Sequence, residues 1–278
     1  MEARLLIITP TLGRSATLHE TVEGVRNLAL SATHVLACPS SRIPDLQGRF
    51  PHCAVIADQG KASSLWGGLN AGLQKFGPDF EWFTYINDDD LLLPGFAQMF
   101  RLHTSRSQAA PIAYGDVELI DASGEFLARM TTEKNVDWFI PHLLAGITPV
   151  TQQGMIARTG IINQVGMFDP DYTLTADLLF WVQCLQQKLA FQYYPLRVAR
   201  YRIQPDQLSR DVDLAGRERD RIVGRIQPTR SQRLRRRFAR LRYRILNISR
   251  YLERYRNVGF ASSKTLLSTS AGSRANRN

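Results

Sequence analysis

Three consecutive carboxylates follow one of the most strand-like runs of the sequence. Trp82-Phe83-Thr84-Tyr85-Ile86 is aromatic and β-branched in character, and Asn87 and Asp88-Asp89-Asp90 come directly after it. Carboxylates crowded at the end of a strand raise one another's pKa unless a cation lies among them. Open α/β sheets also bind their ligands at the carboxyl ends of strands. Two interpretations follow: a Mg²⁺ or Mn²⁺ that bridges carboxylate and diphosphate, or a solvated Asp-rich loop before a helix that begins at Pro94.

The first hundred residues supply the elements that would position this triplet. Apolar runs predict buried strands at residues 4–9, 35–38 and 53–57. Between them, apolar residues recur at helical spacing over residues 18–29 and 61–76, and Ser15 is a candidate cap of the first helix. This β-α-β order indicates an α/β fold with a mostly parallel central sheet flanked by helices.

The second half of the sequence is less regular. Asp121-Ala122-Ser123-Gly124 is typical of the turn of a hairpin, which would join strands at 112–120 and 125–130. The remaining patterns predict a buried run at 154–157, a helix over about 177–187, and strands near 191–194 and 198–201.

Composition excludes several classes of protein. The 278 residues can bury a full core, and their 44% hydrophobic and 22% charged content is that of a soluble globular protein. No apolar stretch is long enough to span a bilayer, and the short apolar run at the N-terminus lacks the cleavage site of a signal peptide. Cys38, Cys53 and Cys184 are too widely spaced for a disulfide framework or a zinc site, which indicates a reducing, cytoplasmic location.

The basic residues are concentrated at the C-terminal end. The net charge of +10 divides into +13 for the residues from Thr229 onward and −3 for residues 1–228. An apolar stripe at alternating spacings of four and three predicts an amphipathic helix in the same segment, with these members: Leu234, Phe238, Leu241, Ile245, Ile248, Leu252 and Tyr255.

Three partners are candidates for this basic helix. It could lie on an anionic membrane surface, pack on another helix or on the preceding domain, or bind nucleic acid. Nucleic acid ranks third, because the stripe lacks interleaved aromatic stacking positions and any known binding module. The expected organisation is a catalytic domain at 1–212, a helical Arg-rich segment at 213–260 and a disordered tail at 261–278.

Taken in order, the segments before the basic tail resemble the family 2 glycosyltransferases, which are inverting enzymes of the GT-A fold. Ile7–Arg14 resembles the first strand and nucleotide-contacting turn of that family, and Asp58-Gln59-Gly60 with Gly68–Gly72 resembles its next motif. Ile86–Phe96 is similar to its metal loop, and Thr175–Trp181 falls where the family carries an acidic base. The ordered set carries the resemblance, since no single motif is decisive.

The resemblance covers about residues 4–210 and implies roles for individual side chains. The metal, Mn²⁺ or Mg²⁺, is expected on Asp89 directly, with Asp90 as a further ligand. Such a cation would stabilise the negative charge that develops on the leaving diphosphate. Gln153-Gly154 and Val165–Asp169 resemble the approach to the acceptor site. Contacts to the nucleotide sugar, with UDP as the favoured nucleotide, are expected from Thr9, Pro10, Thr11, Arg14, Asp58, Asn70 and Asp88.

Inversion also requires a base that takes the proton of the acceptor hydroxyl. Asp177 is the candidate on the resemblance. The alternative for Asp177 is a helix N-cap, because an amphipathic helix is predicted to begin there.

The sequence departs from the family pattern at three places. Asn87 stands where many members have an acid, and no acid occurs in Cys38-Pro39-Ser40-Ser41, where the family usually has one after its second strand. No His occurs near residues 201–209, where Arg202 or Gln207 could substitute electrostatically.

Three functions from different classes are therefore expected, in this order. The first is a metal-dependent inverting glycosyltransferase, which would use a UDP-sugar and a glycan or lipid-linked acceptor in cell-surface polysaccharide synthesis. Its location would be cytoplasmic, at the inner face of the membrane. The second is a nucleotide-sugar-binding module without catalysis, held by its tail to a membrane-associated synthesis complex. The third is a basic adaptor that binds nucleic acid.

Overall fold

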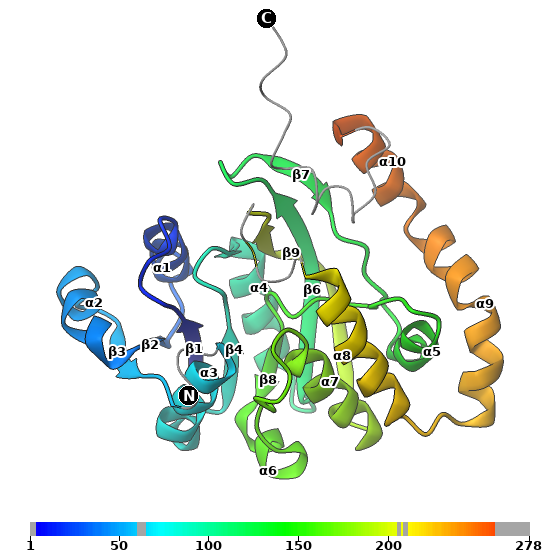
Figure 1. Cartoon of the computed structure of the whole chain (residues 1–278), viewed down its shortest axis with the longest axis horizontal. Coiled ribbons are helices and arrows are strands. Elements are labelled where there is room, and N and C mark those ends of the chain that lie inside the picture. The colour runs from blue at the N-terminus through cyan, green and yellow to red at the C-terminus, as the bar shows by residue number, and fades with distance from the viewer. Residues whose placement is uncertain (1–3, 60–64, 205–206, 208–210, 259–278) are drawn as a thin grey trace, which may run out of the picture. The chain divides into compact units, whose positions relative to one another are not determined.

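The computed structural model describes residues 4–59, 65–204, 207 and 211–258, whose helices and strands are labelled in Figure 1, and the chain divides into two compact units. The first unit consists of Met1–Asp116 and Gln152–Ala199, and the second of Val117–Thr151 and Arg200–Asn278. The strands are β1 (Leu5–Pro10), β2 (Ala32–Cys38), β3 (Ala54–Ala57), β4 (Trp82–Tyr85), β5 (Leu91–Leu92), β6 (Ile112–Ile120), β7 (Phe126–Arg129), β8 (Ile156–Arg158) and β9 (Phe191–Arg202). The α-helices are α1 (Leu18–Arg26), α2 (Ile43–Arg49), α3 (Leu65–Phe76), α4 (Pro94–Thr104), α5 (Phe139–Leu144), α6 (Ile162–Val165), α7 (Ala176–Gln186), α8 (Val212–Gly224), α9 (Arg230–Leu246) and α10 (Ile248–Val258).

The sheet has the strand order β3-β2-β1-β4-β8-β6-β9-β5, and of β6 and β9 the first unit includes only residues 112–116 and 191–199. Strand β1 is buried along its whole length and pairs in parallel with both β2 and β4, and β2 pairs in parallel with β3. These four strands confirm the parallel β-α-β half that the sequence predicts. Strand β8 is antiparallel to both β4 and β6, so the other half of the sheet departs from the parallel pattern.

The helices of the first unit pack on this sheet through small and apolar residues. Helix α3 lies on β1 and β2, and a Cβ added at Gly72 would come within 2.8 Å of the Ile8 side chain. A Cβ added at Gly95, next to the first residue of α4, would come within 2.1 Å of the Arg197 carbonyl oxygen. Glycine at these two positions therefore lets α3 lie close to β1 and lets the start of α4 lie against β9. Helix α4 begins at Pro94, as predicted.

The second unit contains the predicted hairpin and the basic helices. Strands β6 and β7 pair antiparallel, and the Asp121 carboxylate accepts hydrogen bonds from the backbone of Ser123 and Glu125 in the turn between them. Helix α5 packs on α9, and β7 packs on α10.

Two expectations about the second half need correction. Residues 191–194 and 198–201 belong to one continuous strand, β9, rather than to two. The basic segment forms two helices, α9 and α10, that meet at Asn247, rather than one. The side-chain amide of the buried Asn247 donates to the Tyr243 carbonyl oxygen, and its oxygen accepts from the Thr132 backbone. The bond from Thr132, which is distant in sequence, helps to fix the break between the two helices. The domain boundary at 212 stays a prediction, and the tail at 261–278 lies outside the described residues.

Candidate active site

The carboxyl end of β1 contacts the acidic loop through Thr11. The Thr11 hydroxyl donates to Asp88 Oδ2 over 2.5 Å and accepts from the Gly13 backbone over 2.9 Å. The two preceding residues face the core: the buried Thr9 hydroxyl lies 2.9 Å from His34 Nε2, and Pro10 lies against α3 beside Gly68. Thr9, Pro10 and Thr11 were all expected to contact the nucleotide sugar. Of these three residues, only Thr11, which follows β1, faces the carboxylates.

Two hydroxyl groups hold the backbone of the acidic loop. Ser15 donates to the Asp88 carbonyl oxygen over 3.0 Å, and Thr21 of α1 donates to the Asp90 carbonyl oxygen over 2.8 Å. The expectation that Ser15 caps the first helix is wrong, because the N-cap position belongs to Thr17 and α1 begins at Leu18. The Ser15 hydroxyl ties the loop to the turn after β1 instead.

Asp90 is fully buried and is held by amides. Its Oδ2 atom accepts from Asn87 Nδ2 over 3.0 Å and from Gln153 Nε2 over 3.2 Å. Asn87, which departs from the family pattern, therefore orients the last carboxylate of the triplet. Gln153 links the acidic loop to the segment that the sequence assigned to the acceptor approach.

The remaining two carboxylates of the triplet are half-buried. Burial raises the pKa of Asp88, and the hydrogen bond from Thr11 partly offsets that rise. Among the described residues, no group of three or more His, Cys, Asp or Glu side chains is placed to hold a metal ion. The donor set still fits Mg²⁺ or Mn²⁺, because the half-buried Asp89 offers carboxylate oxygens and such cations keep waters and phosphate oxygens as their other ligands. The assignment of the metal to Asp89 and Asp90 stays a prediction.

Asp177 lies in the first turn of α7. The N-cap position of this helix is Thr175, so the interpretation of Asp177 as the N-cap is wrong. The Asp177 Oδ1 atom accepts from the Leu178 backbone over 2.8 Å. Burial raises the pKa of Tyr85, at the end of β4, well above its ordinary value, and the charges of Asp177 and Asp90 add to the rise. The buried Tyr85 hydroxyl has no hydrogen-bond partner within the described part of the chain.

Helix α3 positions the segment that leads to Asp177. Both ends of the Asn70 amide bond the backbone of Phe168: Nδ2 donates over 2.8 Å, and Oδ1 accepts over 3.1 Å. Trp66 stacks on the Phe168 ring and donates to the Thr173 carbonyl oxygen over 3.0 Å. Asn70 therefore acts here as a support for the segment that carries the candidate base, and its expected contact with the donor stays a prediction.

Charged side chains also lie at the ends of β2 and β3. Burial raises the pKa of the Cys38 thiol to about 11; the charge of Asp58 adds to the rise and that of Arg42 opposes it. The Asp58 backbone donates to the Cys38 carbonyl oxygen over 2.8 Å, whereas Arg14 is exposed.

Arg42 is the residue that the sequence did not reveal. Its Nη2 atom donates to the Gly13 carbonyl oxygen over 2.7 Å, next to Thr11. Its Nε atom is buried, and none of the described residues accepts a hydrogen bond from it. A guanidinium with a spare donor beside the strand ends suits an anion such as a diphosphate. Arg42 follows the segment at 38–41 in which an acid was expected, and no motif pointed to it.

Arg202 and Gln207, the expected substitutes for a family His, belong to the second unit. The buried Arg202 donates through Nη1 to the Ala122 carbonyl oxygen over 3.2 Å, and Gln207 donates to the Arg202 carbonyl oxygen over 2.8 Å. Their electrostatic role toward a diphosphate stays a prediction.

Comparison with known proteins gives a match at the level of structure. No family model matches the sequence, and no curated protein matches it. Residues 1–349 of TarS from S. aureus, solved with UDP-GlcNAc, match with a TM-score of 0.55 at 10% identity, over 92% of this chain and 80% of that one. The same part of TarS matches with a TM-score of 0.53 at 12% identity, over 89% of this chain and 74% of that one. Its complex with UDP gives 0.52 at 11% identity, over 80% and 69%.

At these identities the likeness establishes the fold alone. The expected GT-A type of α/β fold, with helices flanking a central sheet, is confirmed. Within the described residues, no helix combines the length and the hydropathy needed to cross a bilayer.

Proposed function

We propose that this chain is an inverting glycosyltransferase that moves a sugar from a nucleotide diphosphate sugar, with UDP-sugars favoured, to a glycan or lipid-linked acceptor. The site of action would be the inner face of the membrane, in cell-surface polysaccharide synthesis. One observation carries the proposal: Tyr85 ends the parallel strand that the acidic loop follows, and its ring centroid lies 5.7 Å from that of Phe168, in the segment that leads to Asp177. The fold is also that of a protein solved with UDP and with UDP-GlcNAc.

The donor would lie across the carboxyl ends of β1, β2 and β4. Asp88, oriented by Thr11, would accept hydrogen bonds from the ribose hydroxyls. Arg42 would meet the diphosphate through its spare Nε donor, with the exposed Arg14 adding positive charge. Asp58 at the end of β3 would bond the base or the ribose.

A divalent cation would be held by Asp89. Asp90 would fix the loop through its hydrogen bonds with Asn87 and Gln153. When bound, Mg²⁺ or Mn²⁺ would supply positive charge to the leaving diphosphate. The burial of Asp90 means that Asn87 and Gln153 would keep the loop in one conformation whether or not a cation is bound.

Asp177 would take the proton of the acceptor hydroxyl. The acceptor oxygen would form its bond to the anomeric carbon while the bond from that carbon to the diphosphate oxygen breaks on the opposite face, which inverts the configuration. The proton would pass to a carboxylate oxygen of Asp177, whose Oδ1 atom is already oriented by the Leu178 N–H. Trp66 and Asn70 would keep this carboxylate in position through the 168–173 backbone.

The test compares Asp177→Asn with Asp171→Asn, a control that makes the same change at an exposed position just before α7. Asp177→Asn should lower transfer or hydrolysis of a UDP-sugar by at least about 10²-fold, the contribution expected of a general base. The thermal stabilisation of the chain by the UDP-sugar should remain within a few degrees of the unchanged protein. Full turnover by Asp177→Asn would overturn the proposal.

A second candidate function has one observation in its favour. Asp90 is occupied by two amides, and no cluster of three metal-ligating side chains is found in the described residues, which is compatible with a module that binds the nucleotide sugar without turning it over. Tight binding of a UDP-sugar with neither hydrolysis nor transfer would support this module, and hydrolysis by the purified chain would exclude it.

A further inference from the structure

Helix α9 presents a band of apolar side chains that the protein leaves uncovered. The opposite face of α9 packs on the rest of the second unit, and Ala239 and Tyr243 on that face are buried. The uncovered band consists of Leu234, Phe238, Leu241 and Ile245, which are 58%, 57%, 60% and 60% exposed. A contiguous exposed apolar surface of this kind marks an interaction site rather than scattered surface residues.

The orientation of α9 is fixed by polar contacts on its packed side. Arg242 donates to both carboxylate oxygens of Glu133 over 3.1 and 3.3 Å, and the Tyr243 hydroxyl bonds the Thr131 hydroxyl. Arg235 lies 3.6 Å from the Asp137 carboxylate. These contacts hold the helix with its apolar band turned outward.

Helix α10 continues the uncovered band. Arg129 donates to Glu253 over 2.7 Å, and the Arg250 guanidinium donates to the Met130 carbonyl oxygen, so α10 is also anchored on one side. Its other side exposes Ile248, Leu252 and Tyr255, which are 62%, 54% and 49% exposed. Each helix therefore has one anchored side and one exposed apolar side, and the exposed apolar residues of the two helices are together called the apolar band.

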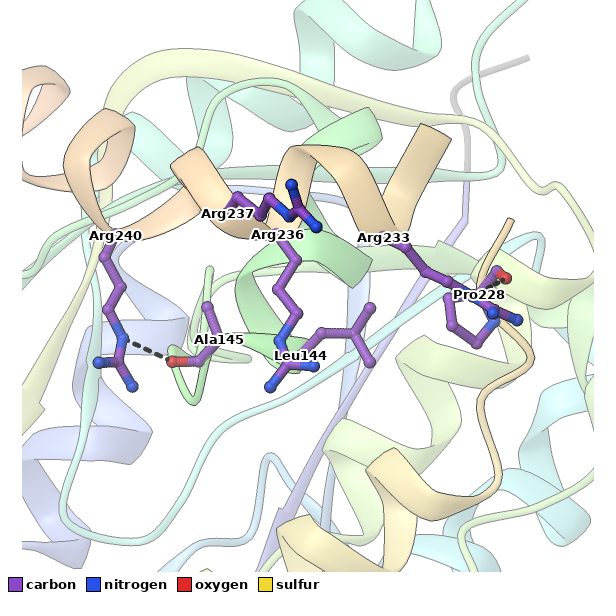
Figure 2. Close-up of a pocket in the computed structure, with 7 residues that line it drawn as sticks. All are labelled: Leu144, Ala145, Pro228, Arg233, Arg236, Arg237 and Arg240. Carbon is purple, nitrogen blue, oxygen red and sulfur yellow. Dashed lines mark hydrogen bonds between the residues drawn. The ribbon is translucent and has the colours of Figure 1, made fainter. Parts of the chain in front are cut away.

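A pocket of about 650 Å³ lies between α9, the end of α5 and Pro228, which precedes the N-cap residue of α9 (Figure 2). It is lined by Leu144, Ala145 and Pro228 and by four arginines of α9: Arg233, Arg236, Arg237 and Arg240. Arg240 donates to the Ala145 carbonyl oxygen over 3.1 Å, and Arg233 donates to the Pro228 carbonyl oxygen over 3.2 Å.

The four arginines that line the pocket favour the binding of an anion. Along the part of α9 and its surroundings that the structure describes, none of the four arginines has a carboxylate within 4.0 Å. Arginine pairs with phosphate through two parallel hydrogen bonds, so a phosphate-bearing ligand suits the pocket. Because Arg237 lies one helical turn from both Leu234 and Leu241, the pocket borders the apolar band directly.

Charge decides between the occupants that could cover such a surface. A second copy of the chain would bring arginines against arginines, since α9 contains no acidic residue. Nucleic acid would pair its phosphates with the arginines but would leave the apolar band exposed to water. An anionic phospholipid surface satisfies both, because phosphates meet the arginines while the apolar side chains enter the boundary between headgroups and acyl chains.

We propose that α9 and α10 bind an anionic membrane surface, with lipid phosphates in the arginine pocket and the apolar band inserted at the interface. This inference does not depend on the proposed transferase activity, because it concerns side chains of the second unit alone.

The experiment is sedimentation of the full chain with vesicles. Vesicles of phosphatidylcholine with 30% phosphatidylglycerol should bind the chain, and vesicles of phosphatidylcholine alone should bind it at least about tenfold more weakly. The double variant Arg236→Gln/Arg237→Gln should lose about 30-fold in affinity, since each arginine near an anionic surface contributes about fivefold. Leu241→Ser should lose about tenfold or more, because one leucine no longer leaves water.

The matched control removes two positive charges elsewhere. Arg26→Gln/Arg49→Gln alters exposed arginines of α1 and α2 and should bind vesicles within about twofold of the unchanged chain. All the altered side chains are exposed, and unchanged circular dichroism and melting temperature should confirm folding.

Three results would overturn the proposal. One is equal binding to neutral and anionic vesicles, or equal loss in the control and in the arginine-pocket variant. Another is binding of inorganic diphosphate to the pocket, lost in Arg236→Gln/Arg237→Gln, without any binding to vesicles, which would make the ligand a soluble phosphate. The third is no vesicle binding together with a dimer that Leu241→Ser dissociates, or with RNA binding that the pocket variant abolishes.

Discussion

The ion pair between Arg242 and Glu133 holds α9 on the rest of the second unit. We predict the effect of removing this ion pair with the substitution Arg242→Met. Methionine keeps an unbranched apolar side chain of similar length against Trp138, over whose ring the Arg242 guanidinium lies at 4.5 Å. The change therefore removes the charge and two hydrogen bonds to a fully buried carboxylate while preserving most of the packing.

The cost can be worked out from the partners that remain. Removing one member of a buried ion pair typically costs about 3–5 kcal/mol, and loss of a cation over an aromatic ring adds about 0.5–1 kcal/mol. Glu133 keeps a bond with His142 Nε2 at 2.8 Å and one from the Asn135 backbone at 2.9 Å, and the Arg242 side chain is 29% exposed, so the lower end applies. We expect Arg242→Met to lower the free energy of unfolding by about 3 kcal/mol at pH 7, or about 150-fold in the equilibrium constant.

The loss should also depend on pH. Burial by itself would raise the pKa of Glu133, but hydrogen bonds from His142, Asn135 and Arg242 outweigh it and lower the pKa below its ordinary 4.5. A carboxylate with a lowered pKa stabilises the fold above its ordinary pKa, and this stabilisation is lost as the pH falls through the folded-state pKa. The difference between the two proteins should therefore be full at pH 7 and should shrink below about pH 4.5.

Urea unfolding followed by circular dichroism at pH 7 and at pH 4 measures both effects. Arg236→Met, at an exposed position of the same helix, is the control and should change the free energy of unfolding by less than about 0.5 kcal/mol. A loss below 1 kcal/mol in Arg242→Met at pH 7, or a loss of the same size at both pH values, would refute the role given to this ion pair.

Three further predictions concern the first unit. Burial, with the charge of His52, lowers the pKa of His34 to about 3, so its neutral form stabilises the fold above its ordinary pKa of 6.5 and that contribution is lost toward acid. The free energy of unfolding should fall by about 2 kcal/mol between pH 6.5 and 5.0, and an equal fall in His34→Gln would contradict this origin. Gly72→Ala should cost about 1–3 kcal/mol because its Cβ would meet Ile8 at 2.8 Å, whereas Gly48→Ala in α2, with open space around it, should stabilise by about 0.5–1 kcal/mol. Equal melting temperatures for the two alanine variants would argue against the close packing of α3 on β1. Removal of divalent cations with EDTA should reduce the thermal stabilisation by UDP-GlcNAc, and Mn²⁺ should restore it; an equal shift with and without cation would count against the metal.

The sequence predicted the parallel half of the fold because each of its strands is a local apolar run. The run before Asp88 forms β4, and helical spacing located α3 and α7 to within a few residues. The position of the acidic loop at the end of a parallel strand could therefore be inferred from neighbouring residues alone.

The contacts that shape the site could not be predicted, because they join residues far apart in the chain. Gln153 bonds the side chain of Asp90 across 63 positions, and Thr21 bonds its backbone across 69. Arg42 reaches Gly13 from a short 3-10 helix that carries no pattern. Likewise, the break between α9 and α10 at Asn247 is held by a hydrogen bond from Thr132, and the spacing of apolar residues within a helix cannot predict so distant a contact.

The acidic loop and the segment before Asp177 are anchored by separate sets of residues. The loop is tied to the turn after β1 and to α1 by Ser15 and Thr21, whereas the approach to α7 is tied to α3 by Trp66 and Asn70. No residue is common to the hydrogen bonds of the two sets. Over evolutionary time, a descendant of this chain could therefore change the acidic loop, and with it the proposed cation site, while its candidate base stays in place, and the reverse holds equally.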